Sequence, residues 1–523
     1  MNQPDKFLVK YLQQAAAQDT SSLQSMWDDW PDRDVRIWVQ TLQQLVAAAL
    51  RNNRVAQISD ASQRVLSVQD VLAAQVRLAE QGVHAGDVVM IKANNDLQGV
   101  SAMLAAWLQG CTVCPVDPTA TPQLHALIVQ ESKAVAVFDA DGQLARVADA
   151  QPRCLRVARA TGVDLALTIF TSGSSGNPKG VILTHSNVMS SLRAITTYLE
   201  IGPQQRILCI PPMFLDYGVY QVLFTLFTGC SLVLGTGLKS PMKILDLIQS
   251  CQPTILPVVP ALASGLAKVL NTFNQTIDSL QMVTNTGGHL APATIEALRR
   301  SFPKARIYPM YGLTETKRAL FLPPQFVDDK EGSVGSAMPG LDARVVITRP
   351  DGELVEAEIG EIGELYLRGA SVMQGYHRDN GGAGARLIPG AYRDDMWLAT
   401  GDLFEADADG CLYFRGRSKS LIKQKGYCIY PRDIEAAAET LPSVASAIVV
   451  GRTENDGDES AVLFVVLKPN DNHDAARETV REHIHTQLHK SVQPRLIEFL
   501  NDWPALPVGK IDLGALQNMA KSL

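Results

Sequence analysis

The sequence predicts an α/β protein: a large N-terminal domain of mainly parallel sheets flanked by helices, a β-rich subdomain, and a small α+β C-terminal domain. Three observations predict this class. Apolar strands alternate with helical segments up to about residue 310, which is typical of parallel sheets covered by helices. Short strands and turns dominate from about residue 331, and a new pattern begins after Arg417-Ser418-Lys419. We therefore expect domains over 1–418 and 419–523.

The first elements alternate between two periodicities. Residues 1–45 are rich in Gln, Asp and Trp and helical in character. Helical periodicity follows over 71–82 and 103–108. Apolar runs between and after these helices predict buried strands over 88–91, 111–116, 165–170 and 280–283.

Later elements are shorter. In the β-rich subdomain we expect strands, paired as hairpins, over 343–347, 363–367 and 410–414. In the C-terminal domain, Pro431 stands early in the first turn of an expected helix, a position that proline tolerates. The rest of that domain is expected to contain strands over 447–450 and 461–467 and a helix over 477–489.

Composition excludes several classes of function. The 523 residues carry 47 basic and 54 acidic side chains, a net charge of −7, which argues against general binding to nucleic acids or anionic membranes. The sequence contains no run of about 18 uncharged apolar residues, so we expect no membrane span. The N-terminus has no basic-then-apolar signal pattern, so we expect a cytoplasmic protein.

Residues 171–179 form the most informative segment, which reads Thr-Ser-Gly-Ser-Ser-Gly-Asn-Pro-Lys. Its glycines let the backbone approach a ligand, and its hydroxyls and N–H groups are natural donors to phosphate oxygens. Lys179 adds a positive charge suited to a polyphosphate. An ordinary surface loop is the alternative, but the preceding strand and the lysine favour a phosphate loop. It is not a Walker A loop, because Pro178 precedes the lysine and Gly180 follows it.

Other clusters place polar or glycine residues where plain turns would also serve. Gly287 and Gly288 follow an expected strand and would let a flat ring pack on the backbone. Tyr311 offers an aromatic face, and Glu315 offers a carboxylate of the kind that holds Mg²⁺ beside a polyphosphate. The Asp402 carboxylate could accept hydrogen bonds from both ribose hydroxyls of a nucleotide, as acidic residues do at other nucleotide sites.

Together these clusters resemble the adenylate-forming superfamily, which includes acyl-CoA synthetases, adenylation domains of peptide synthetases and firefly-type luciferases. The resemblance covers roughly residues 50–516. Its motifs fall in family order: the phosphate loop, Tyr-Gly-Leu-Thr-Glu at 311–315, Thr-Gly-Asp-Leu at 400–403, Gly-Arg-Ser-Lys-Ser-Leu-Ile-Lys at 416–423, and Pro-Val-Gly-Lys at 507–510.

The resemblance implies ATP and Mg²⁺ as cofactors and gives each motif a role. The β- and γ-phosphates would be held by Thr171, Ser172, Ser174 and Lys179. Adenine would lie against Gly287, Gly288 and Tyr311, and the ribose against Asp402 and Arg417. Thr314 would contact the α-phosphate and Glu315 would bind the metal.

The same resemblance implies a mobile C-terminal domain that serves two half-reactions. Lys510 would bridge the substrate carboxylate and the α-phosphate during adenylation. Lys419 would be the hinge, and Lys425 and Gly426 would face the site during thioester formation.

The acid is indicated by Asp216, Tyr217 and Gly218, which lie where the family lines its acid pocket. Amino-acid-activating members place an aspartate there to pair with the substrate ammonium, and a buried carboxylate is costly without such a cation. This favours an amino acid, although an aspartate bonded to backbone would look the same. A fatty or aryl acid activated by an acyl-CoA synthetase is the alternative.

No carrier motif is visible in the sequence, so we expect the thiol acceptor to be a separate molecule. It is either the phosphopantetheine arm of a separate carrier protein or free CoA, and the sequence does not decide between them. A luciferase-like oxygenase would share the same adenylation residues. A non-catalytic binding protein would be expected to lack one of the motifs, whereas Lys179, Glu315 and Lys510 are all present.

Overall fold

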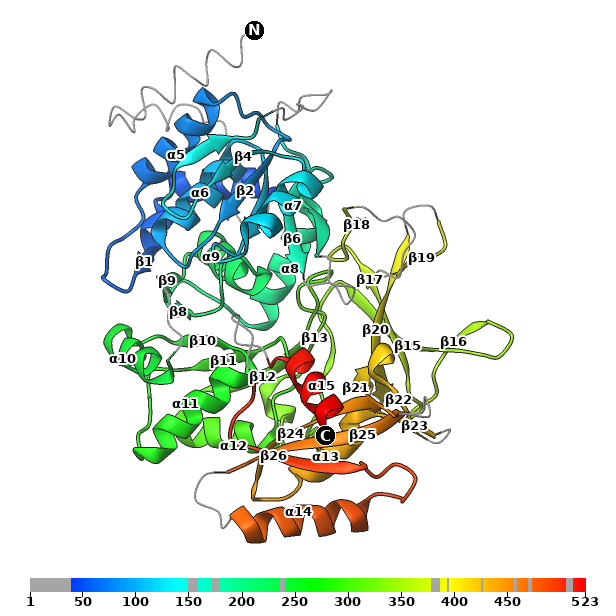
Figure 1. The fold of residues 1–523 in the computed structure, drawn as a ribbon. Helices are drawn as coiled ribbons and strands as arrows, with labels where there is room; N and C mark the ends of the chain where they lie inside the picture. The colour runs from blue at the N-terminus through cyan, green and yellow to red at the C-terminus, as the bar shows by residue number, and fades with distance from the viewer. Residues whose placement is uncertain are drawn as a thin grey trace.

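The computed structural model shows two stacked α/β sheets, a β-rich subdomain beside them and a small C-terminal domain beneath (Figure 1). The residues that it describes are 39–148, 159–171, 178–235, 240–377, 386–392, 395–424, 427–454, 459–468, 473–504 and 511–523. Within these ranges no helix is both long and apolar enough to span a bilayer.

The first sheet is parallel in its centre and antiparallel at its edges. Its strands, in spatial order, are β18 (Gly375–Tyr376), β7 (Lys179–Thr184), β6 (Leu165–Thr171), β3 (Thr112–Val116), β2 (Val88–Lys92), β4 (Ala134–Phe138) and β5 (Leu144–Arg146). β6 and β7 form an antiparallel pair, so the strands on either side of residues 172–177 are neighbours in one sheet and a strand, not a helix, follows Pro178. This agrees with the exclusion of a Walker A loop.

The second sheet has a parallel run that carries most of the predicted site. Its strands, in spatial order, are β1 (Ile58–Asp60), β9 (Ser231–Leu234), β8 (Arg206–Cys209), β10 (Ile255–Val258), β11 (Met282–Asn285), β12 (Arg306–Tyr311), β13 (Leu320–Phe321) and β14 (Ser336–Ala337). All neighbours from β1 to β12 are parallel. The ends of β8, β10, β11 and β12 therefore open on one edge of the sheet, where ligands bind in such folds.

Helices cover both sheets. Those of the first sheet and the shared interior are α4 (Leu42–Arg51), α5 (Val68–Glu80), α6 (Leu97–Leu108), α7 (Pro122–Ser132), α8 (His185–Tyr198) and α9 (Asp216–Thr228). The outer face of the second sheet carries α10 (Pro241–Cys251), α11 (Pro260–Thr272) and α12 (Pro292–Ser301). Alternate strand residues face the two cores, as Ile207 and Leu208 do.

Short polar signals set where these helices begin. Thr41, Ser67 and Thr184 each cap a helix in a reciprocal capping box with the residue three positions later. Proline occupies the first turn of α7, α10, α11 and α12, where its missing N–H costs nothing. α9 ends at Gly229, whose positive φ of 81° is readily adopted by glycine.

The β-rich subdomain is a mainly antiparallel sheet of hairpins, as the sequence predicts. Its strands are β15 (Leu341–Thr348), β16 (Leu354–Glu356), β17 (Gly363–Gly369), β19 (Arg386–Pro389), β20 (Met396–Ala406) and β21 (Leu412–Arg417). The pairing of β20 with β21 sets Asp402 opposite Arg417. Two predicted ribose residues therefore meet across adjacent strands.

The C-terminal domain follows a short 3-10 turn, η3 (Ser418–Ser420). Its elements are β22 (Ile422–Gln424), β23 (Tyr427–Ile429), α13 (Pro431–Glu439), β24 (Val444–Thr453), β25 (Glu459–Leu467), α14 (His473–Gln487), β26 (Leu496–Leu500) and α15 (Leu513–Ser522). Its hydrophobic cores are separate from those of the N-terminal domain. The predicted fold class is confirmed. The strand expected over 280–283 begins and ends two residues later than predicted, as β11 over Met282–Asn285.

The packing of α9 gives a first testable prediction. A Cβ on Gly218 would lie 2.2 Å from the carbonyl oxygen of Pro212, which is backbone and cannot move aside cheaply. We expect Gly218→Ala to lower the free energy of unfolding by about 1–3 kcal/mol, measured by urea denaturation. Gly514→Ala, on an exposed part of α15 where the nearest atom is a side-chain oxygen of Asp512 at 3.2 Å, is the control. Equal stability of the two variants would contradict this packing.

Candidate active site

The first and last residues of the phosphate loop, Thr171 and Lys179, are hydrogen-bonded to each other. Thr171 ends β6 and Lys179 begins β7, and the Thr171 hydroxyl donates to the Lys179 carbonyl at 3.5 Å. The Lys179 ammonium lies over the ring of Tyr376, with Nζ 5.4 Å from the ring centroid. Ser172 and Ser174 lie outside the described residues.

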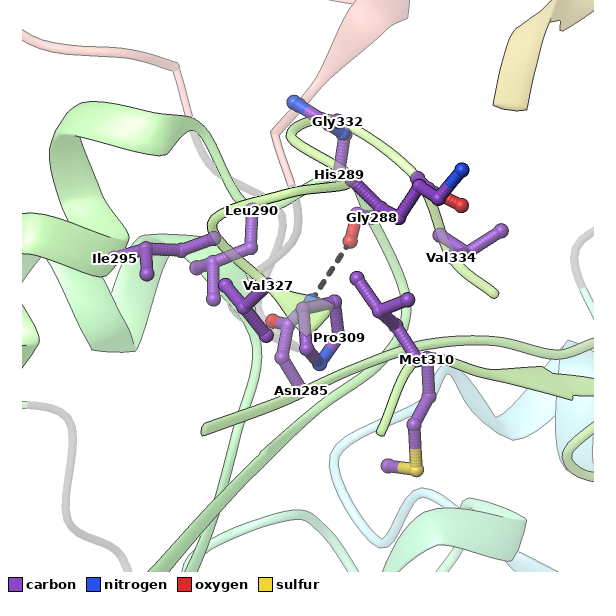
Figure 2. A pocket seen from close by; sticks show the side chains of 13 residues that line it. Asn285, Gly288, His289, Leu290, Ile295, Pro309, Met310, Val327, Gly332 and Val334 are labelled. Carbon is purple, nitrogen blue, oxygen red and sulfur yellow. Dashed lines mark hydrogen bonds between the residues drawn. The ribbon is translucent and has the colours of Figure 1, made fainter. Parts of the chain in front are cut away.

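The predicted adenine segment follows β11. Gly287 has a φ of 80°, a left-handed conformation that favours glycine, and the Asn285 side chain donates to the Gly288 carbonyl at 3.1 Å. Figure 2 shows this bond at a pocket that Asn285, Gly288 and His289 line together with residues of β12 and its surroundings. The backbone of Gly288 thus lies at the edge of a hollow beside the sheet.

The same segment touches the C-terminal domain. Arg432 in α13 is hydrogen-bonded to Nε2 of His289 at 2.9 Å and also pairs with Glu435 and Glu439. Burial, with the neighbouring charge of Arg432, holds the pKa of His289 well below its usual range. Arginine can only donate, so the neutral imidazole accepts through Nε2. The orientation of the small domain is thereby linked to the predicted adenine segment.

Tyr311, Asp402 and Arg417, which the resemblance assigns to the adenine and the ribose, lie in one cluster. The Tyr311 hydroxyl donates to Oδ2 of Asp402 at 2.6 Å, and Nε of Arg417 lies 3.2 Å from Oδ1. Asp402 is buried, which raises its pKa, while the Arg417 charge and the Tyr311 hydrogen bond act in the opposite direction. The Phe404 ring packs edge-on against the Tyr311 ring, with the two ring centroids 4.9 Å apart. Both carboxylate oxygens of Asp402 therefore have protein partners.

A tight turn after β12 presents Thr314 and Glu315. Lys317 has a left-handed φ of 72°, and its ammonium donates to the Thr314 carbonyl. A Cβ on Gly312 would lie 2.0 Å from the Lys317 carbonyl oxygen, so the turn closes only over glycine. Glu315 is fixed from a distant segment, because its carbonyl accepts from the Met373 N–H at 2.8 Å and its carboxylate accepts from the Tyr376 hydroxyl.

The predicted acid pocket lies at the start of α9, which follows β8. Asp216 is the first residue of α9 and is half-buried, and the Tyr217 hydroxyl donates to the Thr284 carbonyl of β11 at 2.8 Å. The guanidinium of Arg318 stacks over the Tyr217 ring, 4.5 Å from its centroid. Gly218 allows the helix to approach the backbone of residues 211–212. The start of α9 is thus held against the site edge of the second sheet.

Lys317 is a second charged group near this pocket. It is buried, which lowers its pKa to about 8, while the nearby carboxylates of Asp216 and Glu315 act in the opposite direction. It forms no ion pair within 4.0 Å with Asp216 among the residues described. The protein thus provides a cation near Asp216 without closing a direct salt bridge.

Two of these residues were missed by the sequence reasoning. Tyr376 is 61 residues from Glu315 and lies on a two-residue strand, so no local pattern marks it. Lys317 belongs to the conspicuous Thr-Lys-Arg run after Glu315, which is a detectable signal, but its burial depends on the turn. Lys425, Gly426 and Lys510 lie outside the described residues, and Lys419 falls within η3.

Comparisons with known proteins identify the family to which the chain belongs. The model for "AMP-binding enzyme" matches residues 47–377, and the model for "AMP-binding enzyme C-terminal domain" matches residues 433–510. The chain is 26% identical over 472 residues to a probable CoA ligase, CCL5, of Humulus lupulus, covering 83% of this chain and 84% of the relative. It is 29% identical over 471 residues to an isonitrile lipopeptide synthase of Streptomyces coeruleorubidus, covering 85% of this chain but 31% of that longer protein.

A solved structure shares the fold. The anthranilate CoA ligase AuaEII in complex with anthranoyl-AMP superposes with a TM-score of 0.79 at 21% identity, covering 92% of this chain and 97% of the other. The family model spans well over half of the chain, including β6, β7, β11, β12 and the turn that holds Glu315. The chain belongs to the AMP-binding enzyme family and is an adenylate-forming ligase.

Proposed function

We propose that this enzyme activates a carboxylic acid with ATP, forming an acyl-adenylate and pyrophosphate, and then transfers the acyl group to a thiol. One observation carries the proposal: Lys179 of the phosphate loop and Glu315 of the following motif both contact Tyr376. A cation suited to phosphate and a carboxylate suited to a divalent metal are thus held side by side.

The proposed nucleotide roles are those that the family resemblance implies for these residues. Thr171, Ser172, Ser174 and Lys179 hold the β- and γ-phosphates, while Gly287, Gly288 and Tyr311 hold the adenine. Asp402 and Arg417 take the ribose hydroxyls, so the bonds that join them to one another and to Tyr311 must partly exchange for bonds to the nucleotide. Thr314 contacts the α-phosphate beside Glu315.

The residues present fit a magnesium ion. Magnesium prefers oxygen ligands and commonly binds through one or two carboxylates together with substrate phosphates. No cluster of three or more His, Cys, Asp or Glu side chains within the described ranges is arranged to hold a metal by itself. We assign Glu315 as a protein ligand, as the family resemblance implies, and bound magnesium would offset phosphate charge.

Adenylation brings two anions together, the substrate carboxylate and the α-phosphate. Lys510 bridges both groups and stabilises the charge that develops as the carboxylate attacks. It belongs to the C-terminal domain, which we propose to rotate about Lys419 so that Lys425 and Gly426 replace it for thioester formation. The short turn η3, which lies between β21 and β22, supports a hinge at this position.

We propose an amino acid as the substrate, with Asp216 as the partner of its ammonium group. Asp216 lies at the start of a helix beside the site edge, which supports this assignment. The buried Lys317 partly compensates its charge, so the aspartate does not by itself require a cationic substrate. A fatty or aryl acid, used by an acyl-CoA synthetase, is therefore the second candidate.

The proposed acceptor is the phosphopantetheine thiol of a separate carrier protein. The similarity to part of a longer lipopeptide synthase supports it, and the similarity to a probable CoA ligase supports CoA instead. Pyrophosphate exchange into ATP, screened over amino acids and over acyl and aryl acids, tests the activity. Thioester formation with CoA or a phosphopantetheinylated carrier then separates the acceptors. No acid-dependent exchange with any acid would refute the proposal.

Removing the bridging lysine should separate the half-reactions. We expect Lys510→Ala to slow adenylation roughly a hundred- to thousand-fold, because losing one charged transition-state contact costs about 3–4 kcal/mol. Thioester formation from a supplied acyl-adenylate should stay largely intact. Lys521→Ala, an exposed lysine of the same domain, is the control. Equal loss of both half-reactions would count against a lysine that serves adenylation alone.

Stiffening the hinge should have the reverse effect. Proline at position 419 fixes φ and removes a backbone N–H, so Lys419→Pro should trap the domain before it rotates. We expect pyrophosphate exchange to persist and thioester formation to fall sharply, measured with the same acid. A Lys419→Ala control should keep both rates. Parallel loss of both reactions in the proline variant would contradict the hinge.

Asp216 decides between the two substrate candidates. We expect Asp216→Asn to reduce kcat/KM for the amino acid about 30-fold or more, since removing one partner of a buried charge pair costs about 2–5 kcal/mol. Asp246→Asn, on an exposed position of α10, should leave it unchanged. Undiminished turnover of amino acids by the Asp216 variant would exclude the ammonium pairing and favour the fatty or aryl acid.

A further inference from the structure

Tyr376 occupies a position from which it reaches two functional segments at once. It is the second residue of β18, which pairs antiparallel with β7 immediately after the phosphate loop. The pairing is reinforced on both sides of the tyrosine, since Gln374 N–H donates to the Ile182 carbonyl at 3.0 Å and His377 N–H donates to the Gly180 carbonyl at 2.8 Å. The backbone of Tyr376 is therefore fixed relative to Lys179.

Gly180 makes this close pairing possible. A Cβ there would lie 2.7 Å from the Phe170 ring and 2.9 Å from the His377 ring. These two rings instead lie nearly parallel, with an interplanar angle of 7°. His377 also contacts the Thr168 hydroxyl through Nε2 at 3.2 Å, which ties the end of β18 to β6.

Within the described residues, the side chain of Tyr376 contacts two groups of the predicted site. Its hydroxyl donates to Oε1 of Glu315, and its ring face lies under the Lys179 ammonium at 5.4 Å. Glu315 is held to the same segment a second time, through the bond from Met373 N–H to its carbonyl. Among the described residues, Tyr376 thus connects Lys179, at the end of the phosphate loop, with the turn after β12.

We propose that Tyr376 is a positioning residue for nucleotide and metal: its hydroxyl orients the Glu315 carboxylate toward the metal, and its ring restrains Lys179 toward the phosphates. This rests on the proposed function. A donor on one carboxylate oxygen fixes the rotation of the group and directs the other oxygen to the ion, an effect worth 10- to 100-fold in metal affinity at other sites. The ring attracts the ammonium through its π face.

Two substitutions separate these effects. Tyr376→Phe keeps the ring and removes the hydroxyl, whereas Tyr376→Leu removes both. Binding of a non-hydrolysable ATP analogue is measured by calorimetry over a range of Mg²⁺ concentrations and in EDTA. We expect Tyr376→Phe to raise the Mg²⁺ concentration for half-maximal tightening about 10- to 100-fold, with affinity in EDTA unchanged. Tyr376→Leu should additionally weaken binding in EDTA.

Tyr413→Phe is the matched control, because its hydroxyl also donates to a carboxylate, that of Asp407 at 3.2 Å in the β-rich subdomain. It should leave the Mg²⁺ dependence unchanged. In a Glu315→Gln background, Tyr376→Phe should have no further effect on Mg²⁺ dependence. A Tyr376→Phe variant that matches the wild type or the control, or an effect that persists without the Glu315 carboxylate, would overturn the proposal.

Failure of this inference is distinguishable from failure of the proposed function. If the wild-type protein binds the analogue with Mg²⁺ and exchanges pyrophosphate while Tyr376→Phe behaves identically, only the role of Tyr376 is wrong. If the wild-type protein shows neither binding nor acid-dependent exchange, the proposed function is wrong and the role of Tyr376 falls with it. Thermal unfolding of each variant checks that the folds are intact.

Discussion

The parallel pairing of β8, β10, β11 and β12 is the constraint on which the rest of the site depends. In a parallel run the carboxyl ends of the strands lie at one edge of the sheet, and a loop or helix follows each strand there. The segment with Gly287 and Gly288 follows β11, the turn with Thr314 and Glu315 follows β12, and Asp216 opens the helix after β8. Segments that are far apart in the sequence are thereby brought to the same edge of the sheet.

Charged groups at this edge are placed in pairs that limit the cost of burial. Asp402 is buried but has Tyr311 and Arg417 on its two oxygens. Lys317 is buried in a strained turn, with its ammonium on the Thr314 carbonyl and two carboxylates near it. Burying a charge without a partner would destabilise the protein by several kcal/mol. These side chains can therefore stay charged at the site because other groups of the protein pair with them.

Much of this arrangement could be predicted from the sequence, because its signals are local. A hydroxyl- and glycine-rich loop after a buried strand, and the Tyr-Gly-Leu-Thr-Glu and Thr-Gly-Asp segments, each fit within a few residues. The structure brings Tyr311, Asp402 and Arg417 into contact, and their roles toward ATP are proposals. Tyr376 could not be found in this way, because its partners come from β7 and from the turn after β12. The burial of Lys317 depends on its own left-handed backbone conformation, which the periodicity of the sequence does not reveal.

The central claim is that the substrate carboxylate attacks the α-phosphate of ATP. It is tested most directly by supplying the acid with ¹⁸O in its carboxylate and following the label by mass spectrometry through one turnover to the thioester. Breakdown of an acyl-adenylate by the thiol leaves one carboxylate oxygen on phosphorus, so the account predicts AMP that carries one ¹⁸O and unlabelled pyrophosphate. Label in inorganic phosphate with ADP as the other product, or no label in AMP, would contradict it.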